Sequence, residues 1–428
     1  MPKPRWWAGV DWSERHGHEV AVVDAAGALV ARARIDDTPD GARELLRLLA
    51  GLSTSHRHSR KQVPVAIETS RGLLVTALRK AGQPMIPLNT AMVARYRGRM
   101  TPTQRRESDA GDALLLANIL RTDGELHRSM AQPSPAAEAL KVLVLAHWHA
   151  RRDQRLYDNR LRSALREYYP AAIHAWTTLP NRTLRAEARA LLQMAPTPRA
   201  AARLRRPQIS KTLTAAGRTR QVAEHTDRLH ALFRAPALRQ PPEVEEAMGE
   251  RMLAILAQLN EICRVESNLT SRLEEMFAAH PHGEIYASMP GVGPVIGARL
   301  LAEIGDDPDR FATAKGLRAY AGAAPLTWAS GGSSSVTERT ACNRRLKVTG
   351  HHWAFATLTR SPGARAYYDR RREAGDRHSA ALRRLYGRLL TCLHHCLATG
   401  QLYSEQAAFS SRELADPTGT EPPAAVPP

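Results

Sequence analysis

Trp7-Ala8-Gly9-Val10-Asp11 is the stretch of sequence that decides the fold, because it is a short apolar run that ends in a carboxylate. With it, residues 18–24 and 28–35 predict three neighbouring strands, the first of which begins near residue 6. Ala25-Ala26-Gly27 provides a tight turn between the last two. The chain therefore begins with a predicted strand meander.

The elements that follow complete an α/β domain. Thr38-Pro39-Asp40 predicts the start of a helix, residues 63–68 a strand, residues 71–81 a second helix and residues 84–88 a last strand. This order resembles the RNase H-like fold, in which acids on the first strand, at the end of the fourth strand and on a later helix lie together. The corresponding helix is expected here from Ser108 to Leu120.

Four acidic residues fall where that topology would gather them: Asp11, Glu68, Asp109 and Asp112. Asp109 and Asp112 are three apart on the predicted helix, so both can point to the same side. Carboxylates this close repel one another, and a fold tolerates them best around cations such as Mg²⁺ or Mn²⁺. Two such ions can activate a nucleophile and stabilise the leaving oxygen of a phosphodiester. Singly, each acid is more often a surface charge or a helix cap; together, they predict a metal site.

The charge of the chain indicates the partner. Its 428 residues include 61 Lys and Arg against 42 Asp and Glu, a formal net charge of +19. This excess favours a polyanion, nucleic acid above all, although a codon bias toward Arg explains part of it. Four cysteines are too few for a disulfide scaffold, and no apolar run reaches membrane-spanning length. We expect a soluble, cytoplasmic protein without a membrane partner.

Arginines flank the acidic cluster in sequence and are candidates for phosphate contacts: Arg97, Arg99, Arg105 and Arg106. A carboxylate site must still attract a phosphate backbone, and adjacent cations can do that. A solvated loop is the alternative for each of them.

The middle of the chain predicts two long helices. Ser134-Pro135 is a good helix start, and the pattern continues to Tyr169, while a second pattern runs from Pro242 to Ala279. The pair predicts an antiparallel hairpin or a coiled-coil contact between subunits. Residues 176–241 between them are rich in Arg and Pro, which favours a nucleic-acid-facing insert, with a partly disordered linker as the alternative.

The last third carries further phosphate-binding signals. Gly291 and Gly293 precede an apolar helix and predict a helix-hairpin-helix element, whose backbone amides suit a phosphate oxygen. Arg344, Arg345 and Lys347 supply cations that could bind phosphate as well.

Ser330 is a candidate nucleophile in the same segment. It stands next to Gly331-Gly332, which leaves its hydroxyl accessible and its backbone permissive, so it could attack a phosphate. On its own, such a sequence is far more often a flexible loop, and the serines at 333–335 are neighbouring candidates.

The whole pattern resembles the DEDD transposases of insertion sequences, which are relatives of Piv-type DNA invertases. The resemblance spans roughly residues 6–400, and its specificity lies in the order and spacing of short motifs. They are Gly9-Val10-Asp11, Ala66-Ile67-Glu68, Ser108-Asp109-Ala110-Gly111-Asp112-Ala113, Pro290-Gly291-Val292-Gly293, Gly305-Asp306 with Arg310-Phe311, Tyr320-Ala321-Gly322, Pro325, Ser330-Gly331 and Ala366-Tyr367-Tyr368-Asp369.

The resemblance implies a domain order and a chemistry. A RuvC-like domain is expected over residues 1–125, a helical or coiled-coil region over 134–280, a mainly helical transposase domain over 281–403 and a disordered tail over 404–428. By the same resemblance, the four acids hold Mg²⁺ and Ser330 forms a covalent link to DNA. The implied partners are donor and target DNA, a structured guide RNA encoded by the element, and further copies of the chain in a homodimer or homotetramer.

The predicted enzyme is thus a DNA transposase or site-specific recombinase. One alternative is a metal-dependent RuvC-like nuclease or Holliday-junction resolvase in which water attacks, so that no covalent protein–DNA species forms. The other is a nucleic-acid-binding protein without activity, and the presence of all four acids argues against it.

Overall fold

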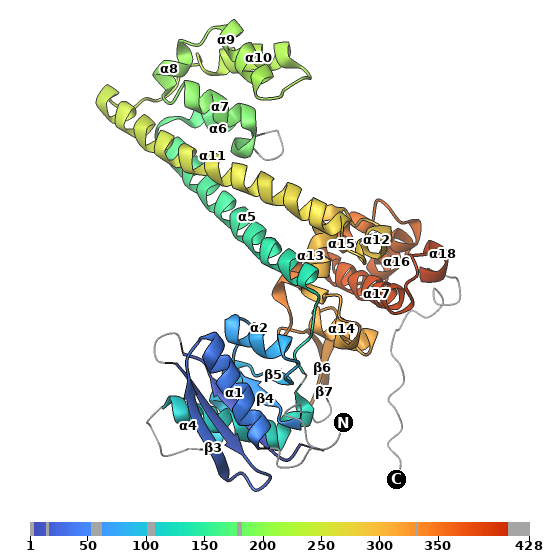
Figure 1. Cartoon of the computed structure of the whole chain (residues 1–428). Helices are drawn as coiled ribbons and strands as arrows, with labels where there is room; N and C mark the ends of the chain where they lie inside the picture. The colour runs from blue at the N-terminus through green and yellow to red at the C-terminus, as the bar shows by residue number, and fades with distance from the viewer. Residues whose placement is uncertain are drawn as a thin grey trace. The chain divides into compact units, whose positions relative to one another are not determined.

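A computed structural model of the chain describes residues 4–13, 17–52, 62–100, 108–127, 129–177, 182–330 and 333–409, without the side chains at 99, 100, 182, 327–336 and 338. It divides into two compact units, Met1–Gln132 and Pro133–Pro428 (Figure 1). None of the helices described is both long enough and apolar enough to span a bilayer.

The first unit contains one mixed sheet in the order β3-β2-β1-β4-β5. β1 pairs antiparallel with β2 and parallel with β4, which confirms the predicted meander followed by parallel strands. The strands are β1 (Trp7–Asp11), β2 (His18–Val23), β3 (Leu29–Ile35), β4 (Val65–Ile67) and β5 (Met85–Pro87). The helices are α1 (Pro39–Gly51), α2 (Leu73–Lys80), α3 (Thr90–Met100) and α4 (Asp109–Asp123).

Side chains along β1 point alternately to the two faces of the sheet, and helices cover both faces. Ala8 and Val10 point into the core that α1 and α2 cover. Gly9 points the other way, where a Cβ would lie 2.1 Å from the carbonyl oxygen of Ala113 in α4. Only glycine at this position lets α4 pack so closely on β1.

The second unit is mostly helical. Its longest helices, α5 (Pro135–Tyr168) and α11 (Pro242–Ala278), lie along each other as an antiparallel pair (Figure 1). This is the intrachain arrangement that was one of the two predicted alternatives. Ser134 caps α5 by accepting a hydrogen bond of 3.2 Å from the amide of Ala137, as its sequence predicts.

The residues between the long helices form a helical subdomain rather than a linker, which corrects that alternative. Its core includes Trp176, Leu213 and Phe233. The buried carboxylate of Glu187 pairs with Arg218 at 3.1 Å, so part of the basic character serves the fold. The elements are α6 (Pro170–His174), a 3-10 turn (Arg182–Leu184), α7 (Ala186–Met194), α8 (Pro198–Ala202), α9 (Arg206–Ala215) and α10 (Val222–Leu232).

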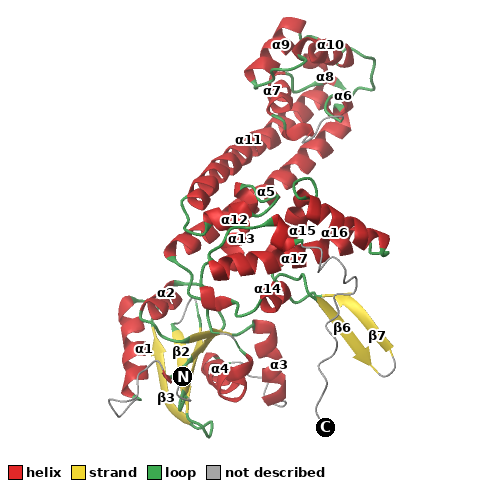
Figure 2. Cartoon of the chain, turned by 90° about the vertical axis from the view of Figure 1, so that its right-hand side faces the viewer, coloured by secondary structure: helices red, strands yellow, loops and turns green. Residues whose placement is uncertain are grey.

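The C-terminal part packs around a core that also receives Leu140 from α5 and Phe277 from α11. Its helices are α12 (Gly283–Ser288), α13 (Pro294–Ile304), α14 (Ala314–Tyr320), α15 (Arg344–Thr357), α16 (Pro362–Glu373), α17 (His378–Thr399) and α18 (Glu405–Ala408). Between α14 and α15, the strands β6 (Pro325–Ser330) and β7 (Ser333–Glu338) form an antiparallel hairpin, which the sequence did not predict (Figure 2).

The predicted tail is ordered in its first residues. The carboxylate of Glu405 accepts hydrogen bonds from the Ser361 hydroxyl at 2.6 Å and from the Gly363 amide at 2.8 Å, and Phe409 is buried. A disordered tail starting at residue 404 is therefore wrong for 404–409, and residues 410–428 lie outside the description.

Candidate active site

Asp11 and Glu68 stand at the same end of two neighbouring parallel strands. Asp11 ends β1, and Glu68 directly follows β4, with Val10 opposite Ile67 in the register. Asp11 lies two residues after Gly9 on the same strand, so both point to the face of the sheet that α4 covers. The sheet thus presents two carboxylates on the side that α4 covers.

The other two acids lie in the first turn of α4. Ser108 caps this helix by accepting a hydrogen bond of 3.2 Å from the Gly111 amide. Acids in a first turn are favoured by the positive end of the helix dipole. Because Gly9 lets α4 lie against β1, Asp109 and Asp112 come close enough to Asp11 to act on its charge.

Burial and the repulsion between like charges raise the pKa of Asp11 and of Glu68. Burial is the largest cause that raises the pKa of Asp11 to about 7, followed by the negative charges of Asp112, Asp109 and Glu68. Burial and Asp112 also raise the pKa of Glu68. Nearby like charges disfavour ionisation in this way when no cation lies between them.

Arg97 is the cation that opposes this repulsion. It projects from α3, and its Nε and Nη2 donate hydrogen bonds to Oδ1 of Asp112 at 3.1 Å and 2.7 Å. Its positive charge lowers the pKa of both Asp11 and Glu68. Arg97 therefore partly takes the place that a bound cation would have among these acids. The other predicted arginines are not placed: the side chain of Arg99, and Arg105 and Arg106 as a whole, lie outside the described residues.

The donor set suits a hard divalent cation, since all four side chains are carboxylates. Within the described ranges, however, no three His, Cys, Asp or Glu side chains converge closely enough to enclose a metal ion. Asp112 is instead held by Arg97. Both hydrogen bonds from Arg97 end on Oδ1 of Asp112, so a cation at the four acids would compete with the guanidinium for this oxygen or bind through Oδ2.

A divalent cation should bind more tightly as the pH rises from about 6 to about 8. A pKa of Asp11 near 7 means that the carboxyl is mostly protonated at the lower pH, and a ligand must lose its proton first. We expect the apparent Mn²⁺ affinity to rise about tenfold, measured by calorimetric titration. Repetition in buffers of different ionisation enthalpy should show proton release at the lower pH, and an affinity independent of pH would contradict the prediction.

The candidate nucleophile lies at the tip of the hairpin in the second unit. Ser330 is the last residue of β6, opposite Ser333, the first residue of β7. The hairpin projects from the helices around it (Figure 2). Gly331 and Gly332, and the side chains of Ser330 and of the serines at 333–335, lie outside the described residues. The structure therefore fixes the backbone position of Ser330 and leaves its role a prediction.

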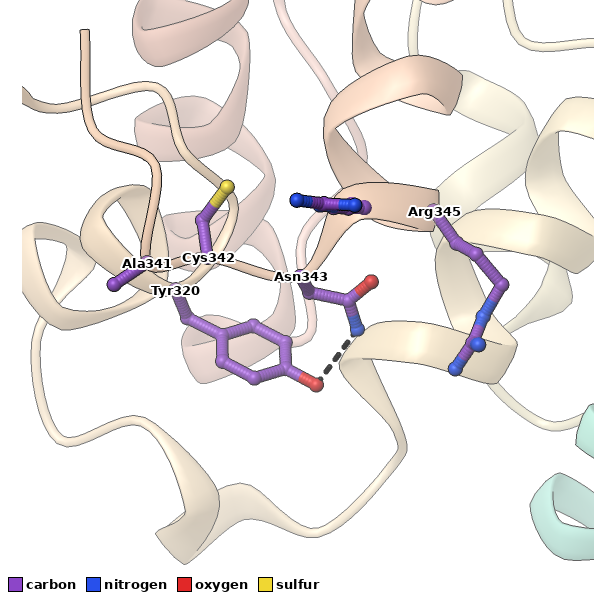
Figure 3. Close-up of a pocket in the computed structure, with 6 residues that line it drawn as sticks. Tyr320, Ala341, Cys342, Asn343 and Arg345 are labelled. Carbon is purple, nitrogen blue, oxygen red and sulfur yellow. Dashed lines mark hydrogen bonds between the residues drawn. The ribbon is translucent and has the colours of Figure 1, made fainter. Parts of the chain in front are cut away.

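A pocket of about 380 Å³ opens where β7 leads into α15, between Tyr320, Cys342, Asn343 and Arg344. Asn343 caps α15, and its Nδ2 donates to the hydroxyl of Tyr320 at 2.8 Å (Figure 3). The same Nδ2 also donates to Oε2 of Glu303 at 2.6 Å. Arg344 is exposed at the pocket, so it can meet a phosphate.

Arg345 has a different role from its neighbour Arg344. Its guanidinium forms an ion pair with Glu303, a carboxylate that is 1% exposed at the inner side of α13. Burial alone would raise the pKa of Glu303, but hydrogen bonds from Arg345 and Asn343 hold it below its usual value. Arg345 is thus engaged by the fold, whereas the sequence suggested that both arginines bind phosphate.

The two glycines before α13 are also distinguished by their surroundings. Gly291 has a φ of +75°, and a Cβ there would lie 2.8 Å from the amide nitrogen of Thr357, so glycine is needed for the loop to pack on α15. Gly293 has open space around it. The loop is pinned through Pro290, whose carbonyl accepts hydrogen bonds from Trp353 and Thr357, both at 2.9 Å. Phosphate binding by this loop stays a prediction.

Sequence reasoning missed the buried network behind the pocket. The sequence feature that could have revealed this network is Glu303, an acid within the apolar helix predicted over residues 296–304. A carboxylate that is buried needs hydrogen-bonding or charged partners. The carboxylate accepts hydrogen bonds from Arg345 and Asn343. Asn343 also donates to the Tyr320 hydroxyl, which accepts a further hydrogen bond of 3.0 Å from Arg310.

Comparison with known proteins identifies the class to which this fold and this site belong. A family model described as transposase matches residues 8–170, which include all four acids. A second model, described as transposase of the IS116/IS110/IS902 family, matches residues 283–369, which include the hairpin and α15. The chain is therefore a transposase, and the part that contains the four acids precedes the part that contains the hairpin.

Relatives that match nearly the whole chain show which proteins are similar to it in sequence. The mini-circle putative transposase for IS117 of Streptomyces coelicolor is 48% identical over 404 residues, covering 94% of this chain and 96% of the relative. The uncharacterized 42 kDa protein of insertion element IS900 of Mycobacterium paratuberculosis is 29% identical, covering 93% of this chain and 96% of the relative. This protein belongs to the IS110/IS116/IS902 family of insertion-sequence transposases, which confirms the family resemblance read from its motifs.

Proposed function

We propose that this protein cuts and rejoins DNA with a divalent cation held by Asp11, Glu68, Asp109 and Asp112 and with Ser330 as its nucleophile. The observation that carries the proposal is the raised pKa of Asp11, because the fold crowds carboxylates whose repulsion a cation would relieve. Mg²⁺ or Mn²⁺ suits these oxygen donors.

In the proposed reaction, a cation bound by the four acids would supply Lewis-acid polarisation and charge neutralisation at the scissile phosphate. Asp11 and Glu68 would hold this cation from the sheet, and Asp109 and Asp112 would hold it from α4. Oγ of Ser330 attacks phosphorus in line and loses its proton, while the bond from phosphorus to the 3′ oxygen breaks and that oxygen gains a proton. The products are a strand linked to Ser330 through its 5′ phosphate and a strand with a free 3′ hydroxyl. Attack by a 3′ hydroxyl on the phosphoserine reverses the step and rejoins DNA.

The proposal includes further partners that follow from the family resemblance. A structured guide RNA would select donor and target DNA, and the chain would act as a homodimer or homotetramer. The net charge of +19 supports extensive contact with polyanions.

A covalent trapping assay tests the proposed chemistry. The protein is incubated with Mg²⁺, labelled element-junction DNA and RNA transcribed from the region beside the gene, and is then separated on a denaturing protein gel. We expect labelled DNA to migrate with the wild-type protein and this species to be lost in Ser330→Ala. Ser333→Ala, altered at the paired position of the hairpin, is the matched control and should retain it. Cleavage that is equal in wild type and Ser330→Ala, without a covalent species, would instead establish a nuclease in which water attacks.

A further inference from the structure

Exposed rings gather on the outer side of α15 in the second unit. Phe355 of α15 is 59% exposed, and its ring lies 6.4 Å from that of His378 at the start of α17. Around the same His378 lie His351 of α15 at 6.5 Å and Tyr368 of α16 at 5.8 Å. We call Phe355, His378, His351 and Tyr368 the aromatic cluster. Phe355, His378 and His351 are exposed and Tyr368 is partly buried, and exposed apolar groups that adjoin one another in this way often mark a binding site.

The aromatic cluster is held in place by the helices beneath it. The Tyr368 hydroxyl and Nδ1 of His378 lie 2.7 Å apart in a hydrogen bond. α17 packs against both α15 and α16 and so links the three helices that supply the rings (Figure 2). The rings therefore form a surface before any ligand arrives, which lowers the entropy cost of binding.

Cations adjoin the aromatic cluster on one side. The ring of His352 lies 6.3 Å from that of His351. Besides burial and His351, the charges of Arg299 from α13 and Arg155 from α5 lower the pKa of His352, so both guanidiniums lie near this edge. Glu266 is the acid that faces Arg299, and Arg151 adds a further positive charge. Positive charge therefore exceeds negative charge beside the rings.

The same face of α15 continues toward the pocket by the hairpin. Arg344, Val348, His351, His352 and Phe355 are all exposed, and their spacing of three or four residues places them on one side of the helix. At a rise of about 1.5 Å per residue, the strip from Arg344 to Phe355 is about 16 Å long. One extended ligand can therefore reach from the pocket to the aromatic cluster.

We propose that this strip binds single-stranded DNA. Unpaired bases stack on Phe355 and His378, and the phosphates between them contact Arg344 and Arg155. Proteins that hold single strands combine stacking platforms with a cationic track in this way, whereas paired bases in a duplex are not available for stacking. The proposal rests on the proposed function only in its choice of DNA, because a transposase separates and exchanges DNA strands.

Fluorescence anisotropy with a short labelled single strand, in EDTA and with the full chain, tests the proposal. Phe355→Ala should weaken single-stranded DNA binding about tenfold, the usual cost of losing one stacked base. Phe355→Trp should bind within about twofold of wild type, since it retains a stacking surface. Leu402→Ala, which removes another half-exposed apolar side chain, is the control and should leave binding unchanged. A 2-aminopurine base in the strand should lose fluorescence on binding to wild type and keep it with Phe355→Ala.

Three results would overturn the proposal. Phe355→Ala could bind single-stranded DNA as tightly as wild type does, or its affinity for duplex DNA could fall as much as its affinity for single-stranded DNA. The third is that the variant loses affinity for an RNA strand of the same sequence and keeps its affinity for the DNA strand. Binding in EDTA requires neither a metal ion nor Ser330. Failure here would therefore leave the proposed strand-cutting chemistry standing, and failure of the trapping assay would leave this binding surface standing.

Discussion

Asp11→Asn is expected to reduce Mg²⁺-dependent strand cleavage to background while nucleic-acid binding stays within about twofold of wild type. Asn keeps the size of the side chain but removes the charge that the proposed cation needs, at the position where the other three acids act together. Cleavage of labelled junction DNA measures the first effect, and anisotropy measures the second. Asp40→Asn, which alters an exposed acid on α1, is the control and should cleave normally.

The same variant should be more stable than wild type in the absence of metal. The pKa of Asp11 is about 7 in the folded chain, above its ordinary value of 3.8, so the favourable contribution of the carboxyl is lost as the pH rises through 7. At pH about 8, Asn should raise the melting temperature by roughly 2–4 °C. The gain should shrink as the pH falls below 7 and vanish below pH about 4, where the carboxyl is protonated in both the folded and the unfolded chain. Full cleavage by Asp11→Asn would exclude the four acids as the metal site.

The fold around these acids could be predicted because its signals are local. The strand period in Trp7–Asp11 and the caps Thr38 and Ser108 each determine a short element from a few neighbouring residues. The ion pair between Arg97 and Asp112 could not be predicted in the same way. It depends on how α3 is oriented against α4, which is a tertiary contact that neither helix encodes alone.

Two elements were missed because their composition resembles that of loops. In the hairpin, β7 is rich in Ser and has Val336 as its one apolar residue, and β6 has a single short alternation, Leu326-Thr327-Trp328. This is too little to mark a pair of strands in the sequence. In the helical subdomain, prolines suggested disorder, yet Pro198 and Pro207 stand in the first turns of α8 and α9. Proline is favoured at such positions because the amide it lacks has no partner within the helix.

Arg345→Met is expected to destabilise the second unit, whereas Arg344→Met leaves its stability unchanged within about 0.5 kcal/mol. Removing Arg345 leaves the carboxylate of Glu303 buried, with a hydrogen bond from Asn343 and the nearby charge of Lys141 still favouring its ionised form. Loss of one partner of a buried ion pair costs about 3–5 kcal/mol, and partial solvent screening of Arg345 lowers our expectation to roughly 2–3 kcal/mol. Urea unfolding followed by circular dichroism measures the difference.

The dependence on pH separates this electrostatic cost from a simple loss of packing. In wild type the pKa of Glu303 lies below its ordinary value of 4.5, so its stabilising contribution is present above that pH and is lost as the pH falls through the folded-state pKa. In Arg345→Met, burial without the guanidinium raises the pKa, and protonation then relieves the buried charge. The destabilisation should therefore be largest near neutral pH and shrink as the pH falls toward about 5. A cost that is the same at both pH values, or an equal cost for Arg344→Met, would show that Arg345 acts through packing or through the helix rather than through Glu303.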